Sequence, residues 1–347
     1  MDAQTDIQFV NGLTGDPAVT VTIPPLQIKV LFDLGVIDSM SNKELLKIKH
    51  IFVSHTHIDH FIGFDRLLRV NIPHFRKIYL AGPKGMIDRV SAKLNGYTWN
   101  LLDPGQLQFF VTEVHGDGLY KRAQLRNDTA FTPEDWIPEI PPGDALIKFP
   151  KGGSVKGIPL DHGTDSISYR IDTPSRWTVC PDAIEQLGLE KGPWIKNLQV
   201  EVAKPLSQQA KAIDINGVSF ETKELTQKIL TPQAPYSVGY ITDIAFSQKN
   251  VDSIKALLTG VSTLICEASF QDAEQERASK KLHLTTRQAA LLAARLGAKN
   301  LKVFHFSNIY AQSADVSLKE AQRFFEGYKK QSQEDLDAEI SRLVVDQ

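Results

Sequence analysis

The sequence predicts a layered α/β fold. Strand patterns alternate with helical patterns along most of the chain, several apolar runs end abruptly at a polar residue, and the composition is that of a globular protein. Of the 347 residues, 42% are hydrophobic and 23% are charged. These values exclude the disordered, collagen-like and coiled-coil classes, and the chain is long enough to bury a large core.

Strands are predicted where apolar and polar residues alternate, or where a short apolar run stops at a polar residue. These segments are 19–23, 26–32, 51–53, 77–80, 166–172, 236–242, 263–267 and 301–305. Helices are predicted where apolar residues recur with helical spacing. They are 64–70, 82–93, 249–259, 286–296, 317–329 and 334–344, with a short helix or turn at 45–49.

We expect residues 1–347 to form one domain, ending in a helix within 331–347 that carries Leu336, Ile340, Leu343 and Val344 on one face. Residues 116–153 differ from the rest, because the segment 134–143 is rich in proline and acidic residues and has no strand or helix period. This segment is predicted to be a surface insertion rather than a linker, since recognisable motifs resume after it.

The charge is nearly balanced, with 39 Lys and Arg against 41 Asp and Glu. Such a chain has no overall field to attract nucleic acid, so a nucleic-acid partner requires a local basic patch. The two cysteines, Cys180 and Cys266, exclude a disulfide framework and are expected to be buried thiols. No apolar run approaches about 18 residues and the first residues are polar, so we expect a cytoplasmic protein without a membrane partner.

Four metal-ligand side chains lie within six residues after the apolar run 51–53. The motif reads His55-Thr-His57-Ile-Asp59-His60. Imidazole and carboxylate groups are ligands of borderline divalent cations such as Zn²⁺, and a loop at the end of a strand brings them together. The motif therefore predicts a metal site rather than a solvated polar loop.

Four ligands from one loop would crowd a single ion that must also hold water, so further ligands are expected elsewhere. His162, Asp243 and His305 each lie at the end of a predicted strand or in the segment before one. Taken singly, each could be a core histidine or a polar residue that ends a strand. Taken together after the first motif, they favour a shared metal site.

This order of motifs resembles the metallo-β-lactamase superfamily, and within it the ribonuclease Z branch of zinc-dependent tRNA 3′-processing endonucleases. The resemblance covers about residues 28–310 and includes the strand that ends at Asp33. It implies a four-layer αββα sandwich with two metal ions, normally Zn²⁺, although the same ligands accept Mn²⁺ or Fe²⁺. One ion would be held by His55, His57 and His162. The other would be held by Asp59, His60 and His305, with Asp243 bridging both, while Asp33 would support the metal loop through hydrogen bonds.

Three further segments resemble the ribonuclease Z branch specifically. The segment 266–270 contains Glu267, and the segment 283–290 begins with His283. The segment 187–194 contains Lys191, Gly192 and Pro193 and resembles part of the arm that grips tRNA. The resemblance thus implies an RNA-binding arm at about 180–230, with Lys196 nearby, and a homodimer in which one subunit's arm serves the other's site.

The implied chemistry is hydrolysis of a phosphodiester. Two ions share a hydroxide and stabilise the attacking and leaving oxygens. His283 would donate a proton to the leaving 3′ oxygen, oriented and kept basic by Glu267. Asp59 and other neighbours of the bridging water are candidates for accepting the nucleophile's proton. His283 could alternatively be a surface residue next to a helix N-cap.

The sequence leaves the function open between two kinds of enzyme, which differ in substrate, and a non-enzymatic scaffold. The chain lacks the Pro-x-Lys-x-Arg-Asn loop that ribonuclease Z proteins place before the first aspartate, and Val36, Ile37 and Asp38 replace the usual Glu-Gly-Thr-Gln. The acidic 116–153 segment also distinguishes it. The leading hypothesis is a ribonuclease Z-like endoribonuclease acting on precursor tRNA. The alternatives are a hydrolase of a small phosphodiester, cyclic nucleotide or other ester, and a nucleic-acid-binding scaffold with an inert metal site.

Overall fold

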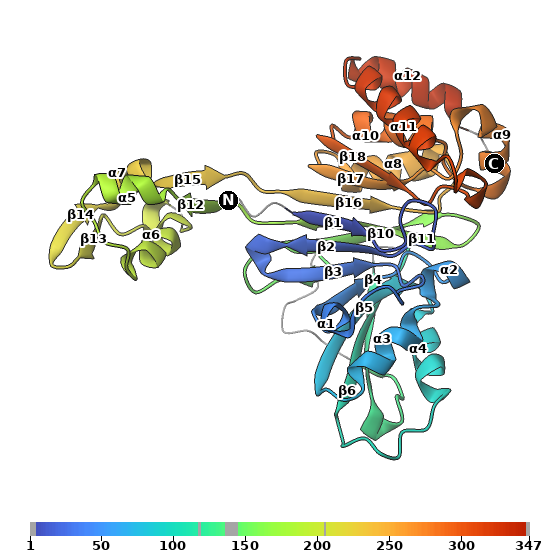
Figure 1. Ribbon diagram of the computed structural model, residues 1–347, viewed down its shortest axis with the longest axis horizontal. Coiled ribbons are helices and arrows are strands. Elements are labelled where there is room, and N and C mark those ends of the chain that lie inside the picture. The colour runs from blue at the N-terminus through green and yellow to red at the C-terminus, as the bar shows by residue number, and fades with distance from the viewer. Residues whose placement is uncertain (1–4, 117–118, 136–144, 205, 345–347) are drawn as a thin grey trace. The chain divides into compact units, whose positions relative to one another are not determined.

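The computed structural model describes residues 5–116, 119–135, 145–204 and 206–344 (Figure 1). The chain divides into two compact units, a larger one made of Met1–Asp172 with Ser237–Gln347 and a smaller one made of Thr173–Tyr236. No helix within the described ranges is long and apolar enough to cross a lipid bilayer.

The first sheet of the larger unit has its eight strands in chain order, and its four central strands, β3 to β6, are parallel. The strands are β1 (Asp6–Phe9), β2 (Val19–Ile23), β3 (Ile28–Phe32), β4 (Ile48–Phe52), β5 (Arg76–Pro83), β6 (Leu107–Val114), β7 (Tyr120–Arg126) and β8 (Glu134–Asp135). Because parallel strands end at the same edge, the loops after β3 and β4 lie side by side.

The second sheet has the strand order β18-β17-β16-β11-β10-β9, with β16, β17 and β18 parallel. Its strands are β9 (Ile147–Lys148), β10 (Ser154–Asp161), β11 (Asp165–Asp172), β16 (Ser237–Ile241), β17 (Thr263–Glu267) and β18 (Asn300–Phe304). A turn at 162–164 joins β10 to β11, and Gly163 in this turn has a positive φ of 71°.

Helices cover the outer face of each sheet, and the two sheets pack face to face (Figure 1). The first sheet carries α1 (Asn42–Leu45), α3 (Phe64–Asn71) and α4 (Met86–Asn95). The second carries α8 (Gln248–Leu258), α10 (Thr286–Arg295), α11 (Ala314–Tyr328) and α12 (Gln333–Leu343). Between the sheets the rings of Phe32 and Tyr240 stack with their centroids 4.6 Å apart. The predicted αββα sandwich is confirmed.

Most predicted elements form, with shifted ends. The strands at 19–23 and 263–267 form as predicted, and the C-terminal helix is α12. The predicted helix start at residue 82 is wrong, because β5 continues to Pro83 and α4 begins at Met86. The predicted short helix at 45–49 is also displaced, since α1 ends at Leu45 and β4 begins at Ile48. At the second place Ile48, which fits a helix face, is buried in β4 instead.

The segment 116–153, predicted to be a surface insertion, contributes a strand that the sequence did not predict. Strand β7 pairs antiparallel with β6 along its whole length, and Leu125 on it is buried. Phe131 is buried as well. The region 136–144, which contains most of the proline-rich run, lies outside the described residues.

The smaller unit contains the region where an arm was predicted. It has two short antiparallel sheets, β12 (Arg176–Val179) with β15 (Leu230–Gln233) and β13 (Ala212–Ile215) with β14 (Val218–Glu221), and the helices α5 (Pro181–Gln186), α6 (Trp194–Val202) and α7 (Thr222–Ile229). Its own apolar core includes Trp194, Leu198 and Leu225. Cys180 precedes α5 and is exposed, so the prediction of a buried thiol is wrong there, whereas Cys266 is buried.

Candidate metal centre

The metal-ligand motif lies on the loop between β4 and α2 (Ile58–Phe61), at the edge where the parallel strands of the first sheet end. His55 and His60 are fully buried, His57 is exposed, and the Asp59 side chain keeps 36% of its surface. The loop therefore presents its four side chains at different depths rather than to solvent as one polar surface.

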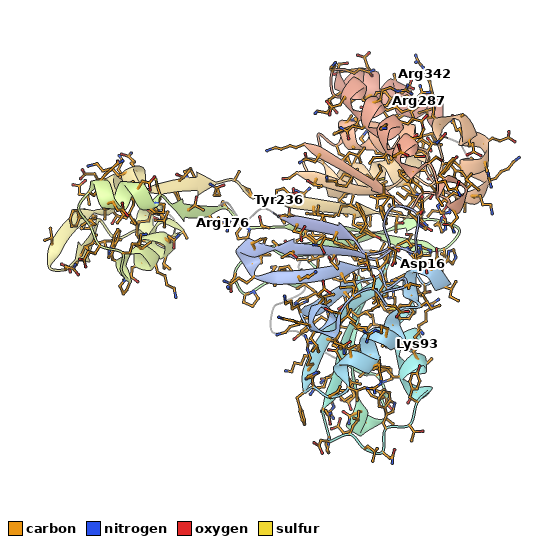
Figure 2. All side chains as sticks on the ribbon, viewed as in Figure 1. Asp16, Lys93, Arg176, Tyr236, Arg287 and Arg342 are labelled. Carbon is orange, nitrogen blue, oxygen red and sulfur yellow. The ribbon has the colours of Figure 1, made fainter. Side chains whose placement is uncertain are left out.

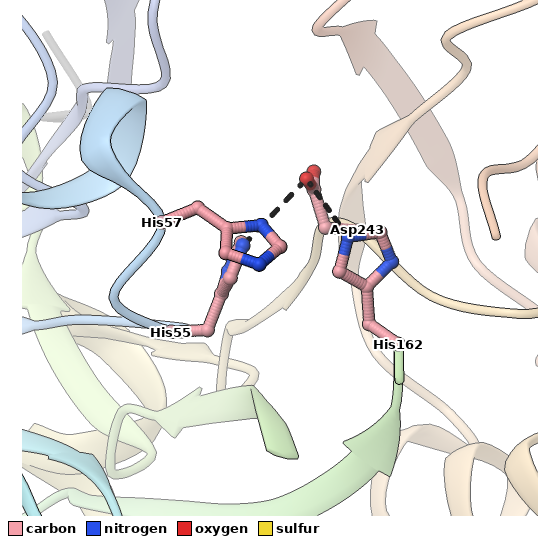
Figure 3. A group of neighbouring side chains, drawn as sticks. All are labelled: His55, His57, His162 and Asp243. Atoms are coloured by element: carbon pink, nitrogen blue, oxygen red, sulfur yellow. Dashed lines mark ion pairs between the residues drawn. The ribbon is translucent and has the colours of Figure 1, made fainter. Parts of the chain in front are cut away.

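Three residues from the second sheet meet this loop. Asp243 follows β16, His305 follows β18, and His162 begins the turn after β10. Asp243 Oδ2 lies 3.3 Å from His60 Nε2, 3.6 Å from His162 Nε2 and 3.8 Å from His55 Nε2. Its other oxygen, Oδ1, lies 3.2 Å from His305 Nε2. Figure 3 shows His55, His57 and His162 turned toward Asp243.

Three groups of potential ligand atoms result among the described residues, each with its atoms within 4.8 Å of one another. The first is His55, His57, His162 and Asp243, the second is Asp59, His60 and His305, and the third, which shares a residue with each of the others, is Asp243, His283 and His305. All seven residues that the sequence singled out as metal ligands therefore lie together.

The histidine rings are held so that Nε2 faces the cluster. Nδ1 of His55 contacts Ser54 Oγ at 3.0 Å, Nδ1 of His60 contacts Asp33 Oδ2 at 3.0 Å, and Nδ1 of His162 lies 2.8 Å from the Leu282 carbonyl oxygen. Such outer partners fix the ring and leave the second nitrogen free for a cation. Among the described residues, His55 Nε2 and His60 Nε2 are buried without a hydrogen-bond partner. These orphaned nitrogens fit a bound metal.

The charges of the cluster also favour a cation. Burial and the neighbouring His60 lower the pKa of His55 to about 2, so this imidazole is neutral and its lone pair is available. Burial opposes ionisation of Asp243, but His305 and His60 outweigh it and hold the pKa of this carboxyl well below its usual range. The cluster therefore combines a neutral imidazole, that of His55, with the Asp243 carboxylate, a pair of donors that fits a divalent cation.

Asp33 links both sheets to this site. It accepts hydrogen bonds from Ser54 N at 2.6 Å and from Tyr240 OH at 2.6 Å, besides its contact with His60. It does not itself belong to any of the three groups of potential ligand atoms. Its role in supporting the metal loop stays a prediction. Asp33, Asp243 and His305 all have positive φ values, of 54°, 49° and 58°. Such backbone conformations are costly for residues other than glycine and gather at functional sites.

Glu267 and His283 form a pair beside the metal cluster. Glu267 is fully buried at the end of β17, and its Oε2 lies 2.8 Å from His283 Nδ1. Ile244 N and Ser269 Oγ donate to the two oxygens of this carboxylate. Burial lowers the pKa of His283, but the Glu267 carboxylate outweighs it, and the net pKa is about 9. His283 is thus held protonated next to Asp243 and His305.

The sequence did not identify the residues that hold the cluster histidines, Asp33 and Glu267 in place. Ser54, Ser269 and Tyr240 are buried residues whose type and spacing do not reveal the contacts that they make. The Leu282 carbonyl could not be found from residue types at all. Two histidines outside the motifs also have contacts elsewhere. His50 stacks on Tyr79 with centroids 5.0 Å apart, and His115 Nε2 lies 3.0 Å from Glu113 Oε2.

Behind the metal loop the backbone of Gly63 passes close to that of Gly35, and a substitution can test this close approach. A Cβ on Gly63 would lie 2.2 Å from the carbonyl oxygen of Gly35, in the segment that follows Asp33. Gly63→Ala must therefore displace that segment or the metal loop. We expect a loss of about 1–3 kcal/mol in the free energy of unfolding, measured by urea denaturation, together with weaker metal binding.

The matched control for this variant is Gly327→Ala. Gly327 lies within α11, and a Cβ there would meet no atom within 4 Å. This substitution is expected to stabilise the protein by about 0.5–1 kcal/mol and to leave metal affinity unchanged. Equal effects of the two substitutions would contradict a special role for the close approach at Gly63.

Comparisons with known proteins agree with this geometry. No protein-family model matches the chain. The "Ribonuclease Z" of Deinococcus radiodurans is 29% identical over 297 residues, which cover 83% of this chain and 85% of that protein. The "Ribonuclease Z" of Prochlorococcus marinus strain MIT 9215 is 26% identical over 340 residues, covering 92% and 95%. The metallo-β-lactamase fold protein YhfI from Bacillus subtilis superimposes with a TM-score of 0.52, at 13% identity over 93% of this chain and 94% of that one.

The two facing sheets and their outer helices, with the histidine–aspartate cluster at one edge, place the chain in the metallo-β-lactamase fold class. Within that class its sequence is ribonuclease Z-like, as the motifs predicted.

Proposed function

We propose that the chain is a metal-dependent phosphodiesterase of ribonuclease Z type that cleaves precursor tRNA at its 3′ side. The observation that carries this proposal is that His283 Nδ1 lies 2.8 Å from the buried Glu267 carboxylate, beside the grouped potential metal ligands. A purely structural metal site would not need a proton donor at its open side. The names of the curated relatives support the choice of RNA as substrate.

We assign two Zn²⁺ ions to the cluster. His55, His57 and His162 would hold one ion, Asp59, His60 and His305 the other, and Asp243 would bridge them. Carboxylate and imidazole ligands of this kind also accept Mn²⁺ or Fe²⁺. When bound, such a pair supplies a hydroxide nucleophile at neutral pH and neutralises charge that develops on the phosphate.

The protein's own side chains would carry out the proton transfers of the reaction. His283 has one nitrogen bound to Glu267, so its other nitrogen can deliver a proton to the leaving 3′ oxygen. The Glu267 carboxylate, fixed by Ile244 N and Ser269 Oγ, keeps that ring oriented and positively charged. Asp59 is partly exposed at the mouth of the site, where it can accept the proton that the nucleophile releases.

The direct test is incubation of the zinc-loaded protein with a 3′-extended precursor tRNA. We expect one cleavage after the discriminator base, leaving a 3′ hydroxyl on the tRNA. The absence of cleavage at any protein concentration would reject tRNA as the substrate.

A small phosphodiester is a second candidate, and one feature of the chain favours it. Residues 173–236, which contain the proposed RNA-binding arm, carry seven Lys and Arg against seven Asp and Glu. Lys191 and Lys196 are exposed near Gly192 and Pro193, but the unit as a whole offers no excess of positive charge to RNA. Rapid hydrolysis of a cyclic nucleotide, with precursor tRNA left intact, would favour this candidate.

The homodimer and the cytoplasmic location stay predictions, and so does tRNA binding by the arm. Sedimentation velocity tests the first of these. A dimer at micromolar concentration is expected from the resemblance, and a monomer would contradict it.

Glu267→Gln tests the pairing with His283 through pH dependence. A general acid works only while it is protonated, so activity is lost as pH rises through its pKa. The amide removes the charge that raises the pKa of His283 and leaves burial, which lowers it. We therefore expect the alkaline limb of the kcat profile to move to lower pH, at unchanged metal content. Bound cations affect the pKa of His283 in the unchanged protein and in Glu267→Gln alike. The readout is therefore the direction in which the alkaline limb differs between the two proteins.

Glu276→Gln is the matched control, because Glu276 is exposed on the neighbouring α9 (Gln275–Lys281) and, among the described residues, forms an ion pair with Lys280 only. Its pH profile should match that of the unchanged protein. A Glu267→Gln profile that also matches would show that the carboxylate does not tune the acid.

A further inference from the structure

A pocket of about 290 Å³ opens beside the metal cluster on the side of His305 and His283. One wall is the segment 14–16, and Figure 2 labels Asp16 there, at the edge of the larger unit. The volume lies at the low end of the range for small-molecule sites, so the pocket accepts about one nucleotide rather than a folded RNA.

The opposite wall contains two cations from one helix. Arg277 and Lys281 are four residues apart on α9, so they lie on the same face of it, and both line the pocket. The Arg277 guanidinium lies 5.3 Å from the centre of the Phe270 ring and 3.1 Å from Glu274 Oε1, which restrict its position. Lys281 forms no ion pair with any described residue, so its charge is free to meet an anion.

The end of α9 connects these cations to the proton donor. The helix ends at Lys281, Leu282 has a left-handed backbone conformation, and His283 N donates to the Ala278 carbonyl oxygen at 3.0 Å. His283 lines the same pocket as Arg277 and Lys281. A general acid must reach the oxygen that leaves, so the leaving nucleoside has to occupy the pocket that contains His283.

A nucleotide strand carries its next phosphate on the 5′ oxygen of that leaving nucleoside. We propose that Arg277 and Lys281 bind this 5′ phosphate and thereby determine specificity for a substrate with a phosphate on the leaving side. The inference rests on the proposed phosphodiesterase activity and names two further substrate-binding residues. Cationic side chains that hold a phosphate oxygen form strong, charge-assisted hydrogen bonds.

The contribution of this phosphate can be measured by comparing two dinucleotides. UpU and pUpU share the same scissile bond, and only pUpU carries a phosphate on the 5′ oxygen of the leaving uridine. We expect the zinc-loaded protein to cleave pUpU with a kcat/KM about 10-fold to 100-fold above that for UpU, mainly through a lower KM. In Arg277→Ala and Lys281→Ala this preference should fall severalfold each, and its salt dependence should weaken.

Lys280→Ala is the matched control, because Lys280 lies on the same helix, pairs with Glu276 and does not line the pocket. It should retain the full preference for pUpU. An equal rate on both dinucleotides in the unchanged protein, or a preference that survives Arg277→Ala and Lys281→Ala together, would overturn the inference.

A binding measurement separates this inference from the proposed function. Uridine 5′-monophosphate has the structure of the leaving product, so calorimetry on the zinc-loaded protein should show tighter binding of it than of uridine, and Arg277→Ala should remove most of that difference. This holds even if neither dinucleotide nor tRNA is cleaved, in which case only the proposed function fails. Equal affinity for uridine 5′-monophosphate and uridine contradicts the inference. A difference in affinity that persists in Arg277→Ala contradicts it as well.

Discussion

His283→Ala is expected to reduce kcat on precursor tRNA by about 10²–10⁴-fold, the usual contribution of a general acid, while the metal content stays at its original value. The reason is geometric. His283 Nδ1 is occupied by Glu267, and the ring lies against those of His162 and His305 without being needed to complete either proposed ion's ligand set. Single-turnover kinetics and metal analysis on the same sample measure both quantities.

His74→Ala is the control for this variant, because His74 is exposed on the larger unit outside the metal cluster. It should retain activity and metal. If His283→Ala lost its metal together with its activity, the side chain would be a ligand rather than an acid. If it kept both, the proton would have to come from elsewhere.

Asp243→Asn is expected to have the largest effect on the metal itself. Asp243 has oxygens within 3.8 Å of the ring nitrogens of four histidines, and its pKa is held well below the usual range, so it is ionised at neutral pH. The amide keeps the shape and removes the charge. Removal of an outer-shell partner costs about 10–100-fold in metal affinity, and loss of the bridging carboxylate should exceed this.

Titration of the metal-free protein with zinc measures this loss, and Asp252→Asn provides the control. Asp252 is exposed on α8 and contacts Gln248. Its affinity for zinc should match that of the unchanged protein. An Asp243→Asn variant that still binds two equivalents with unchanged affinity would refute the bridging position.

The grouping of the candidate metal ligands was predictable because these residues follow recognisable elements. The motif at 55–60 is contiguous and follows a buried strand, so one loop is enough to gather it. Asp243 and His305 come just after parallel strands of one sheet, whose carboxyl ends meet at a common edge. His162 needed the family resemblance as well, because it lies in an antiparallel turn that periodicity alone does not place at that edge.

Other parts of the structure depend on contacts that residue patterns do not encode. Ser269 lies near Glu267 in sequence, but its position between that carboxylate and the His305 carbonyl oxygen comes from the ends of two neighbouring strands, β17 and β18, meeting. In the smaller unit the strands have four residues each, too few for alternation to distinguish them from loops. The polar 120–126 segment was missed as a strand because only Ala123 and Leu125 in it are buried.

In the proposed site, distant strand ends hold two metal ions on one bridging carboxylate. Anomalous X-ray diffraction from zinc-loaded crystals, collected at the zinc absorption edge, would locate these ions. Two peaks about 3.5–4 Å apart are expected, one beside His55, His57 and His162 and one beside Asp59, His60 and His305, with Asp243 between them. A single peak, or peaks away from Asp243, would contradict the proposed site.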